Sequence, residues 1–203
     1  MKIKPKFLIG IDEAGRGPLA GPVSVGVVMC ADNFDFKLLK GVRDSKKLSE
    51  LQRESWFTKL KQWRKEKKLD FKVSLIGAKI IDTKGISFSI RKGIASCLRR
   101  LEASPARSRV LLDGSLKAPA AFKDQKTIIG GDDKEKIISA ASIAAKVTRD
   151  RKMKKLAKIF PNYSFEIHKG YGTALHYQLI EKHGVSEIHR RSFLSALHLP
   201  NFQ

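Results

Sequence analysis

The chain has 203 residues and carries 41 Lys and Arg against 20 Asp and Glu, a formal net charge of +21. This basic excess indicates a polyanionic partner, either a nucleic acid or an anionic membrane surface. Hydrophobic residues make up 42% of the chain, enough to build a core, so disorder is not expected. No apolar run reaches the roughly 18 residues of a membrane span. The basic start at residues 1–6 is not followed by the continuous apolar stretch of a signal peptide.

Cysteine usage and length restrict the protein further. Cys30 and Cys97 are the only cysteines in the chain, and their spacing is not that of a metal site. We therefore expect two free thiols in a reducing compartment, which is typical of a cytoplasmic protein. The length predicts one domain, with a core over about residues 1–160 and a helical C-terminal lobe over about residues 161–203.

Short apolar runs predict the strands. The first run ends in acids and the second is rich in valine, and the glycines and prolines between them favour a turn that makes the two a hairpin. The predicted strands cover residues 6–13, 22–31, 71–76, 109–114 and 126–131.

Helical patterns lie between and after these runs. The first predicted helix begins at Ser49, because Gln52 three residues later completes a capping box. Its apolar residues recur at roughly helical spacing, and we interpret its aromatic residues as core rather than as platforms for bases; they are Leu51, Trp56, Phe57, Leu60 and Trp63. Further helices are predicted over residues 86–101, 139–160 and 173–183. The first half of the helix over 139–160 is rich in small residues, which predicts close packing against it.

The order of the elements is typical of an α/β fold. Three strands come first, then single strands linked by helices, and then helices alone. We predict a mixed sheet of about five strands flanked by helices, with a helical C-terminal lobe.

Acidic residues follow three of the predicted strands. Asp12 and Glu13 close the first, Asp113 closes the fourth, and Asp132 with Asp133 follows the fifth. Because ligands of α/β sheets gather outside strand ends, these carboxylates are expected to meet in one small space. Like charges so close repel, and hard divalent cations such as Mg²⁺ relieve the repulsion. Two such ions about 4 Å apart can clamp the attacking and leaving oxygens of a phosphoryl displacement.

A glycine-rich loop follows the first pair of acids, and residues 12–22 read DEAGRGPLAGP. The glycines allow the backbone to approach a ligand closely, and Arg16 can fork onto a phosphate. This is not a Walker loop, because no GKS or GKT follows. The alternative interpretation of each acid is that it merely caps a strand or begins a turn.

Seven motifs lie along nearly the whole length of the chain. They are GIDEAGRGPLAGPV at 10–23, DSKKLS at 44–49, LLDG at 111–114, GGD at 130–132, ISAASIAAKVTRDR at 138–151, HKGYGTALH at 168–176 and HRRSF at 189–193. Together and in this order they resemble the motifs of bacterial ribonuclease HII, and the first and sixth are highly specific. The resemblance implies the ribonuclease H fold, divalent-metal hydrolysis and an RNA–DNA hybrid substrate. The DEAGRG loop speaks against the related type HIII enzyme.

The resemblance also implies a set of acids. In that family four acids form the site, and by motif they fall on Asp12, Glu13, Asp113 and Asp132, the implied catalytic residues and ligands of two Mg²⁺ or Mn²⁺ ions. The family usually has Lys-Gly-Asp where this chain has Gly-Gly-Asp, and a second acid, Asp133, follows. Counting back from ISAAS favours Asp132 as the fourth ligand, with Asp133 as the alternative.

The resemblance further implies how RNA is recognised. Gly15, Arg16 and Gly17 are implied to read the 2′-hydroxyl of the ribonucleotide, and Tyr171 is implied to stack on the neighbouring sugar. We expect His168 to orient the loop that carries Tyr171. The implied reactions are hydrolysis of the RNA strand of hybrids and incision 5′ of single ribonucleotides in duplex DNA, leaving 3′-hydroxyl and 5′-phosphate ends.

Basic residues concentrate in two stretches. Residues 37–72 carry 13 Lys and Arg against 5 acids, and residues 146–158 carry 7 against Asp150 alone. Most are expected to cover solvated helix faces, and Asp150 is expected to form an ion pair within its helix. Three lysines are expected to contact the nucleic-acid backbone: Lys46, Lys47 and Lys146.

Three classes of function agree with this charge, and the first is the leading hypothesis. A metal-dependent endonuclease accounts for both the basic excess and the acids at strand ends. A non-enzymatic nucleic-acid binder explains the charge but not those acids. A transposase- or resolvase-like enzyme on the same fold shares the carboxylates but not the GRG loop and the KGYGT motif. We expect a cytoplasmic monomer that acts on RNA–DNA hybrids and on ribonucleotide-containing duplex DNA.

Overall fold

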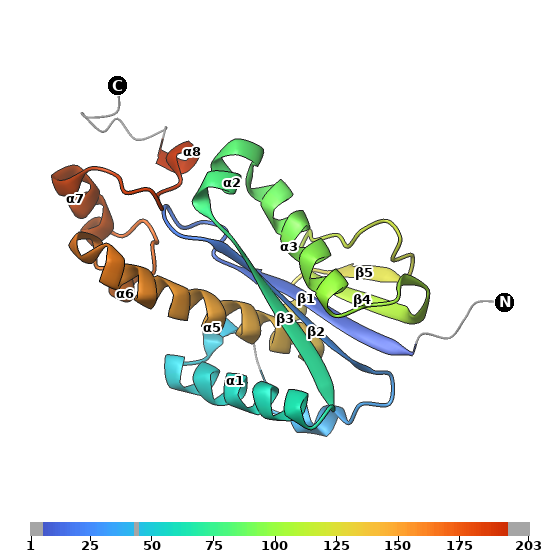
Figure 1. The fold of residues 1–203 in the computed structure, drawn as a ribbon. Helices are drawn as coiled ribbons and strands as arrows, with labels where there is room; N and C mark the ends of the chain where they lie inside the picture. The colour runs from blue at the N-terminus through green and yellow to red at the C-terminus, as the bar shows by residue number, and fades with distance from the viewer. Residues whose placement is uncertain (1–5, 43–44, 195–203) are drawn as a thin grey trace.

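A mixed five-stranded sheet with the strand order β3-β2-β1-β4-β5 forms the centre of the protein (Figure 1). The structure is a computed structural model that describes residues 6–42 and 45–194. The strand β1 pairs antiparallel with β2 and parallel with β4, so the sheet is antiparallel on one side of β1 and parallel on the other. The strands are β1 (Phe7–Ala14), β2 (Val23–Ala31), β3 (Leu69–Ile76), β4 (Ser108–Asp113) and β5 (Gln125–Ile128).

The predicted strands and the mixed sheet are confirmed, with one difference at the fifth strand. The sequence predicts that strand as far as residue 131, whereas β5 ends at Ile128. The chain turns there because Gly130 adopts a left-handed conformation, with φ of 64°, which ends the extended backbone.

Helices cover both faces of the sheet. The helices are α1 (Glu50–Lys65), α2 (Ala78–Lys84), α3 (Ile86–Arg100), α4 (Gly131–Lys134), α5 (Lys136–Ile159), α6 (Phe165–His168), α7 (Ala174–His183) and α8 (Arg191–Leu194). Short 3₁₀ segments lie at Phe36–Leu39, Ser45–Lys47, Pro105–Arg107 and Pro161–Tyr163. Figure 1 shows α1 and α5 on one face of the sheet and α3 on the other. The four longer predicted helices are thus present as α1, α3, α5 and α7.

The long helix α5 lies unusually close to the sheet, as its small residues predict. A side chain on Gly10 of β1 would collide with the backbone of Ile137, and one on Gly26 of β2 would collide with the backbone of Ala141. Both strands therefore require glycine where α5 crosses them. This close contact also places α4, which immediately precedes α5, beside the ends of β1 and β4.

The helix α1 packs against the protein by its predicted apolar face, and Leu51 is the exception. Ser49 caps it in the predicted capping box with Gln52. Phe57 and Trp63 are buried, but Leu51 is 83% exposed. Leu51 lies five positions before Trp56, and at 100° per residue this turns it about 140° away from the buried face.

The helices α6 and α7 lie near the C-terminal end of α5 (Figure 1). Tyr163, Phe165 and Met153 form a small core there, separate from the two cores that flank the sheet. Cys30 and Cys97 are buried free thiols, as predicted. Within the described ranges, no helix combines the length and the apolar character that crossing a membrane requires.

Candidate active site and metal centre

The parallel pairing of β1 with β4 brings the first two acids together. Ile11 lies opposite Leu112 in the register. Asp12 and Asp113 are the next residues of these two strands, so they lie side by side at the same end of the sheet. Asp12 is buried and Asp113 is half-buried. The sequence pattern of acids at strand ends therefore produces the juxtaposition that it predicts.

The third acid, Asp132, comes from the short helix α4 and not from the end of β5 itself. The Asp113 Oδ1 accepts hydrogen bonds from the backbone N–H of Gly131, at 2.7 Å, and of Asp132, at 3.4 Å. A side chain on Gly131 would lie 2.7 Å from the end of the Ile138 side chain and 3.4 Å from Asp113 Oδ1, so glycine gives this approach the most room. The Gly-Gly-Asp sequence is thus the local reason why α4 docks on β4.

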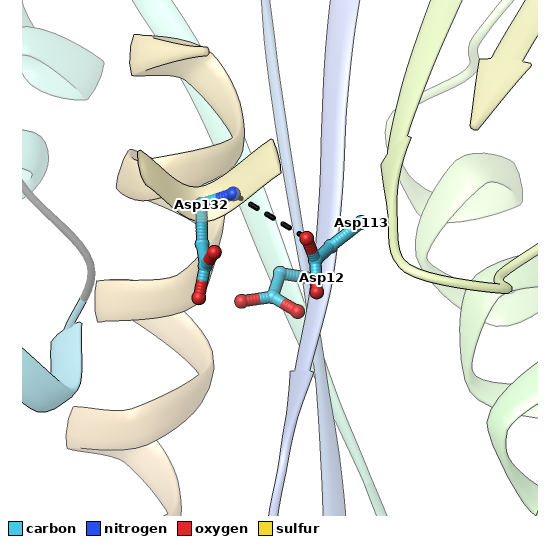
Figure 2. Close-up of side chains that lie close together, drawn as sticks. All are labelled: Asp12, Asp113 and Asp132. Carbon is cyan, nitrogen blue, oxygen red and sulfur yellow. Dashed lines mark hydrogen bonds between the residues drawn. The ribbon is translucent and has the colours of Figure 1, made fainter. Parts of the chain in front are cut away.

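These three acids form one compact group. One carboxylate oxygen from each of Asp12, Asp113 and Asp132 lies within 4.8 Å of the others. Figure 2 shows the three carboxylates facing the same space from β1, β4 and α4. Burial raises the pKa of the Asp12 carboxyl well above its usual range, and the charges of Glu13 and Asp113 raise it further. Hydrogen bonds from Ser142 and from the Glu13 N–H oppose this rise in the Asp12 pKa.

The group suits a hard divalent cation. Its donors are carboxylate oxygens, which Mg²⁺ and Mn²⁺ prefer. Burial is the main cause of the raised pKa of Asp12 and the charges of Glu13 and Asp113 add to it, so a cation between the acids favours their charged forms.

The other predicted acids lie around this group. The Glu13 carboxylate accepts a hydrogen bond from Arg16 Nη1 at 3.4 Å, and it lies outside the group of three. Burial raises the pKa of Glu13, the Arg16 charge lowers it, and the Asp113 charge raises it again. Asp133 turns outward, with 44% of its side chain exposed, and forms an ion pair with Lys47. The structure thus brings Asp132, and not Asp133, to Asp12 and Asp113.

The three predicted lysines all contact acids. Lys46 Nζ lies 3.7 Å from Asp132 Oδ2, and Lys47 pairs with Asp133, so both reach over α4. Lys46 and Lys47 begin the described part of the DSKKLS motif together with Ser45, while its first residue lies outside the described residues. Lys146 Nζ lies 2.9 Å from Asp150 Oδ1, which confirms the ion pair predicted for Asp150.

The glycine loop is held by two buried arginines. Arg190 donates hydrogen bonds to the carbonyl oxygens of Gly15, at 2.7 Å, Arg16, at 2.9 Å, and Gly21, at 3.0 Å. Arg149 lies directly under Gly15, which has φ of 83°, and a side chain there would collide with its guanidinium. Both guanidinium groups are buried, so they fix the loop from the protein side while its other side stays accessible.

Tyr171 lies beside the same loop. Its ring centroid is 5.5 Å from the Arg149 guanidinium carbon and 5.7 Å from Lys146 Nζ, and the residue is 41% exposed. The carbonyl of Gly170, the preceding residue, accepts a hydrogen bond from the Leu19 N–H at 2.8 Å. Residues far apart in the sequence thus form one surface beside the acids.

Three buried histidines support the Tyr171 loop, two of them through a directed chain of hydrogen bonds. The Ser186 N–H donates to His189 Nδ1 at 2.9 Å, so His189 carries its proton on Nε2 and donates it to His176 Nε2 at 3.1 Å. His176 Nδ1 then donates to the Tyr171 carbonyl at 2.9 Å. His168 Nδ1 accepts from the Gly170 N–H at 3.1 Å, so it contacts the loop that it is expected to orient.

We expect acid to destabilise this histidine cluster. Burial lowers the pKa of both His176 and His189 to about 4, against an ordinary value of 6.5. The unfolded chain therefore binds protons that the folded chain rejects, and stability falls as the pH falls from about 6.5 to about 4. A tenfold difference in proton affinity between the folded and unfolded chain corresponds to about 1.4 kcal/mol, so the loss of stability by pH 4 amounts to several kcal/mol.

Urea unfolding of the wild type and of His189→Asn at a series of pH values tests this expectation. His189→Asn should flatten the pH dependence between pH 6.5 and 4, whereas His183→Asn, at an exposed position, should keep it. Equal pH dependence of stability in the wild type and in His189→Asn would contradict the conclusion that these buried histidines are neutral in the folded protein.

Sequence reasoning did not assign roles to Arg149, Arg190, His176 or His189. One signal was available for Arg149: it lies four and seven positions after Ala145 and Ser142, on the small-residue face that packs against the sheet. The basic stretch around it favours a solvated helix face, and that interpretation is wrong for Arg149 because it is fully buried. No local pattern marks Arg190, whose partners are about 170 residues away in the sequence.

Comparison with known proteins now identifies the family. The sequence profile described as Ribonuclease HII matches residues 9–196, which is most of the chain. The chain belongs to the ribonuclease HII family. It is therefore a ribonuclease H, a metal-dependent endonuclease of RNA–DNA hybrids.

Similar proteins of this family come from bacteria and archaea. A ribonuclease HII of Bacillus anthracis is 43% identical over 187 residues, which cover 92% of this chain and 68% of that protein. The crystal structure of the ribonuclease H2 from Pyrococcus horikoshii OT3 has a TM-score of 0.69 and 28% identity, over 92% of this chain and 93% of that chain. The ribonuclease HII of Archaeoglobus fulgidus, solved in a complex with PCNA, has a TM-score of 0.72 and 26% identity, over 91% of this chain and 93% of that chain.

Proposed function

We propose that this ribonuclease HII hydrolyses the RNA strand of RNA–DNA hybrids and also incises duplex DNA on the 5′ side of a single ribonucleotide. The observation that carries the proposal is the group formed by Asp12, Asp113 and Asp132 at the sheet edge, directly beside the glycine loop. The protein acts as a cytoplasmic monomer in this proposal.

The acid group would hold two divalent ions, Mg²⁺ or Mn²⁺, with Glu13 at its margin as a further ligand. When bound, such ions activate water and neutralise charge on a phosphate during displacement. The chain itself contributes the fixed orientation of the carboxylates. Asp113 in particular is held by two backbone N–H groups of α4, so its second oxygen is directed toward the group.

The glycine loop would distinguish RNA from DNA. The 2′-hydroxyl is the group on the sugar that separates the two nucleic acids. Backbone groups of residues 15–17 can approach it because glycine leaves no side chain in the way, and the Arg16 side chain is accessible to the adjacent phosphate. Arg149 and Arg190 hold this loop rigid, so the backbone groups stay in one place for recognition.

The products follow from where the bond breaks. Water adds its oxygen to the phosphorus on the 5′ side of the ribonucleotide, and the bond from phosphorus to the upstream 3′ oxygen breaks. The upstream strand keeps a 3′-hydroxyl, and the ribonucleotide keeps a 5′-phosphate. Lys46, Lys47 and Lys146 would bind backbone phosphates of the duplex, exchanging their present acid partners for them.

Cleavage of three labelled duplexes with Mg²⁺ or with a chelator tests this proposal. The duplexes are an RNA–DNA hybrid, a DNA duplex with one ribonucleotide, and an all-DNA duplex. We expect Mg²⁺-dependent cutting of the first two and none of the third. Binding without cutting would indicate a nucleic-acid binder, and cutting of the all-DNA duplex would indicate a transposase- or resolvase-like nuclease.

We expect Tyr171→Ala to slow incision at a single ribonucleotide far more than it weakens binding. The exposed ring can pack flush on a deoxyribose, whereas a further hydroxyl on that sugar would crowd it. Side-by-side rates on the single-ribonucleotide duplex and on a long hybrid measure the effect, with Tyr177→Ala as a control on α7. Equal slowing of both substrates, or of neither, would show that this ring does not read the junction.

A further inference from the structure

A pocket lies beside the glycine loop, on the side of the sheet covered by α3. It has a volume of about 290 Å³, at the lower end of the size of ligand pockets. Its lining comes from the loop, from α3 and from the segment after β4: Arg16, Ser87, Ile90, Arg91, Ile94, Ser115, Leu116 and Lys117.

The polar part of this pocket is positively charged. Arg16, Arg91 and Lys117 line it together with the hydroxyls of Ser87 and Ser115, and none of the lining side chains is acidic. Among the ion pairs of residues 6–42 and 45–194, none involves Arg91 or Lys117, although other basic residues of this chain find acid partners. Basic side chains that lie together without acidic partners, next to hydroxyl donors, suit an anion with several acceptor oxygens, such as a phosphate.

Part of the pocket lining is apolar. Ile90, Ile94 and Leu116 line the pocket and are buried, so the lining offers carbon surface as well as cations. An inorganic anion gains nothing from contact with such a surface, whereas the ring of a sugar can pack against it. The pocket therefore combines the two kinds of contact that one sugar–phosphate unit requires.

The pocket adjoins the acid group through two connections. Arg16 belongs to both, because its Nη1 lies 3.4 Å from the Glu13 carboxylate while its side chain lines the pocket. Ser115 follows Asp113 by two residues along the chain. A strand whose phosphate reaches the acids can thus place a nearby backbone unit in the pocket.

We propose that this pocket binds one sugar–phosphate unit of the nucleic-acid backbone close to the scissile phosphate, with Arg91 and Lys117 as its phosphate ligands. The proposal rests on the proposed function, since it assumes a nucleic-acid substrate at the acid group. It adds a binding subsite on the α3 side of the protein, opposite to the lysines that reach over α4. The subsite carries no base information, because its contacts are to phosphate and sugar alone.

Matched single substitutions test the subsite. Arg91→Ala and Lys117→Ala are compared with Lys92→Ala on α3 and Lys123→Ala after β4, which are exposed, remove the same charge and do not line the pocket. Affinity for the hybrid is measured without divalent ions over a range of salt concentrations. Each pocket variant should bind about tenfold more weakly and should lower the slope of log K against log salt by about one unit, and each control should change both much less.

A second measurement locates the phosphate. Uncharged methylphosphonate groups replace single phosphates of each strand in turn, and one position should weaken wild-type binding but leave Arg91→Ala binding unchanged. That position distinguishes the cut strand from the complementary strand. Equal effects of pocket and control variants, or no position that couples to Arg91, would overturn the proposal. Wild-type cleavage in the same preparation separates this failure from failure of the proposed function, which would abolish cleavage itself.

Discussion

Asp113→Asn is expected to lower the rate of hybrid cleavage by about a thousandfold or more while the protein stays folded, because the change removes several kcal/mol of charge stabilisation at the reacting phosphate. The asparagine keeps the shape of the side chain and can still accept the hydrogen bonds from Gly131 and Asp132. It removes a negative charge that raises the pKa of Asp12 in the metal-free protein. We therefore expect its melting temperature without metal to equal or exceed that of the wild type.

Cleavage rates at saturating Mg²⁺ and thermal unfolding in a chelator measure the two effects together. Asp124→Asn is the matched control, because Asp124 is exposed near the opposite end of β4, where it pairs with Arg109. Near-normal turnover of Asp113→Asn would remove Asp113 from the site. A large loss of stability would show that the acid holds α4 in place and does little else.

Asp132→Asn is expected to lose nearly all activity, whereas Asp133→Asn should keep most of it. The two acids are neighbours on α4, but only Asp132 faces Asp12 and Asp113, while Asp133 turns out to Lys47. The two variants have the same change in charge and the same helix position within one residue. A difference in activity between the two variants therefore reports the effect of the direction in which each side chain points.

Single-turnover rates of both variants on the same hybrid measure this contrast, and we expect a ratio of about a hundredfold or more. Comparable activity of the two variants would mean that α4 shifts when substrate binds. Loss of activity in Asp133→Asn alone would make Asp133 the ligand and would contradict the geometry of the site.

Local pattern was sufficient to predict most of the strands and the first hairpin. The valine-rich second strand and the apolar run before Asp12 alternate with turn residues in the way that strands do, and both pair as predicted. The capping box at Ser49 likewise placed the start of α1 correctly. By contrast, α2 has seven residues, which is too short for helical periodicity to emerge.

The acid group could be predicted only in part. The acids at strand ends are visible in the sequence, and the parallel pairing of β1 with β4 in the structure brings Asp12 to Asp113. The position of Asp132 depends on a left-handed Gly130 and on hydrogen bonds to Asp113, neither of which has a periodic signature. The arginines under the glycine loop escape prediction for the same reason, since long-range contacts determine their role.

The measurement that tests the account most directly is the mapping of the cut in a DNA duplex that holds one ribonucleotide. The wild-type protein, a labelled duplex and Mg²⁺ are sufficient, with product ends identified by their mobility and by their response to phosphatase. We expect a single cut on the 5′ side of the ribonucleotide, with a 3′-hydroxyl upstream and a 5′-phosphate on the ribonucleotide. A cut on its 3′ side with a cyclic phosphate would mean that the 2′-hydroxyl attacks in place of water, and would contradict the roles given to the acid group and the glycine loop.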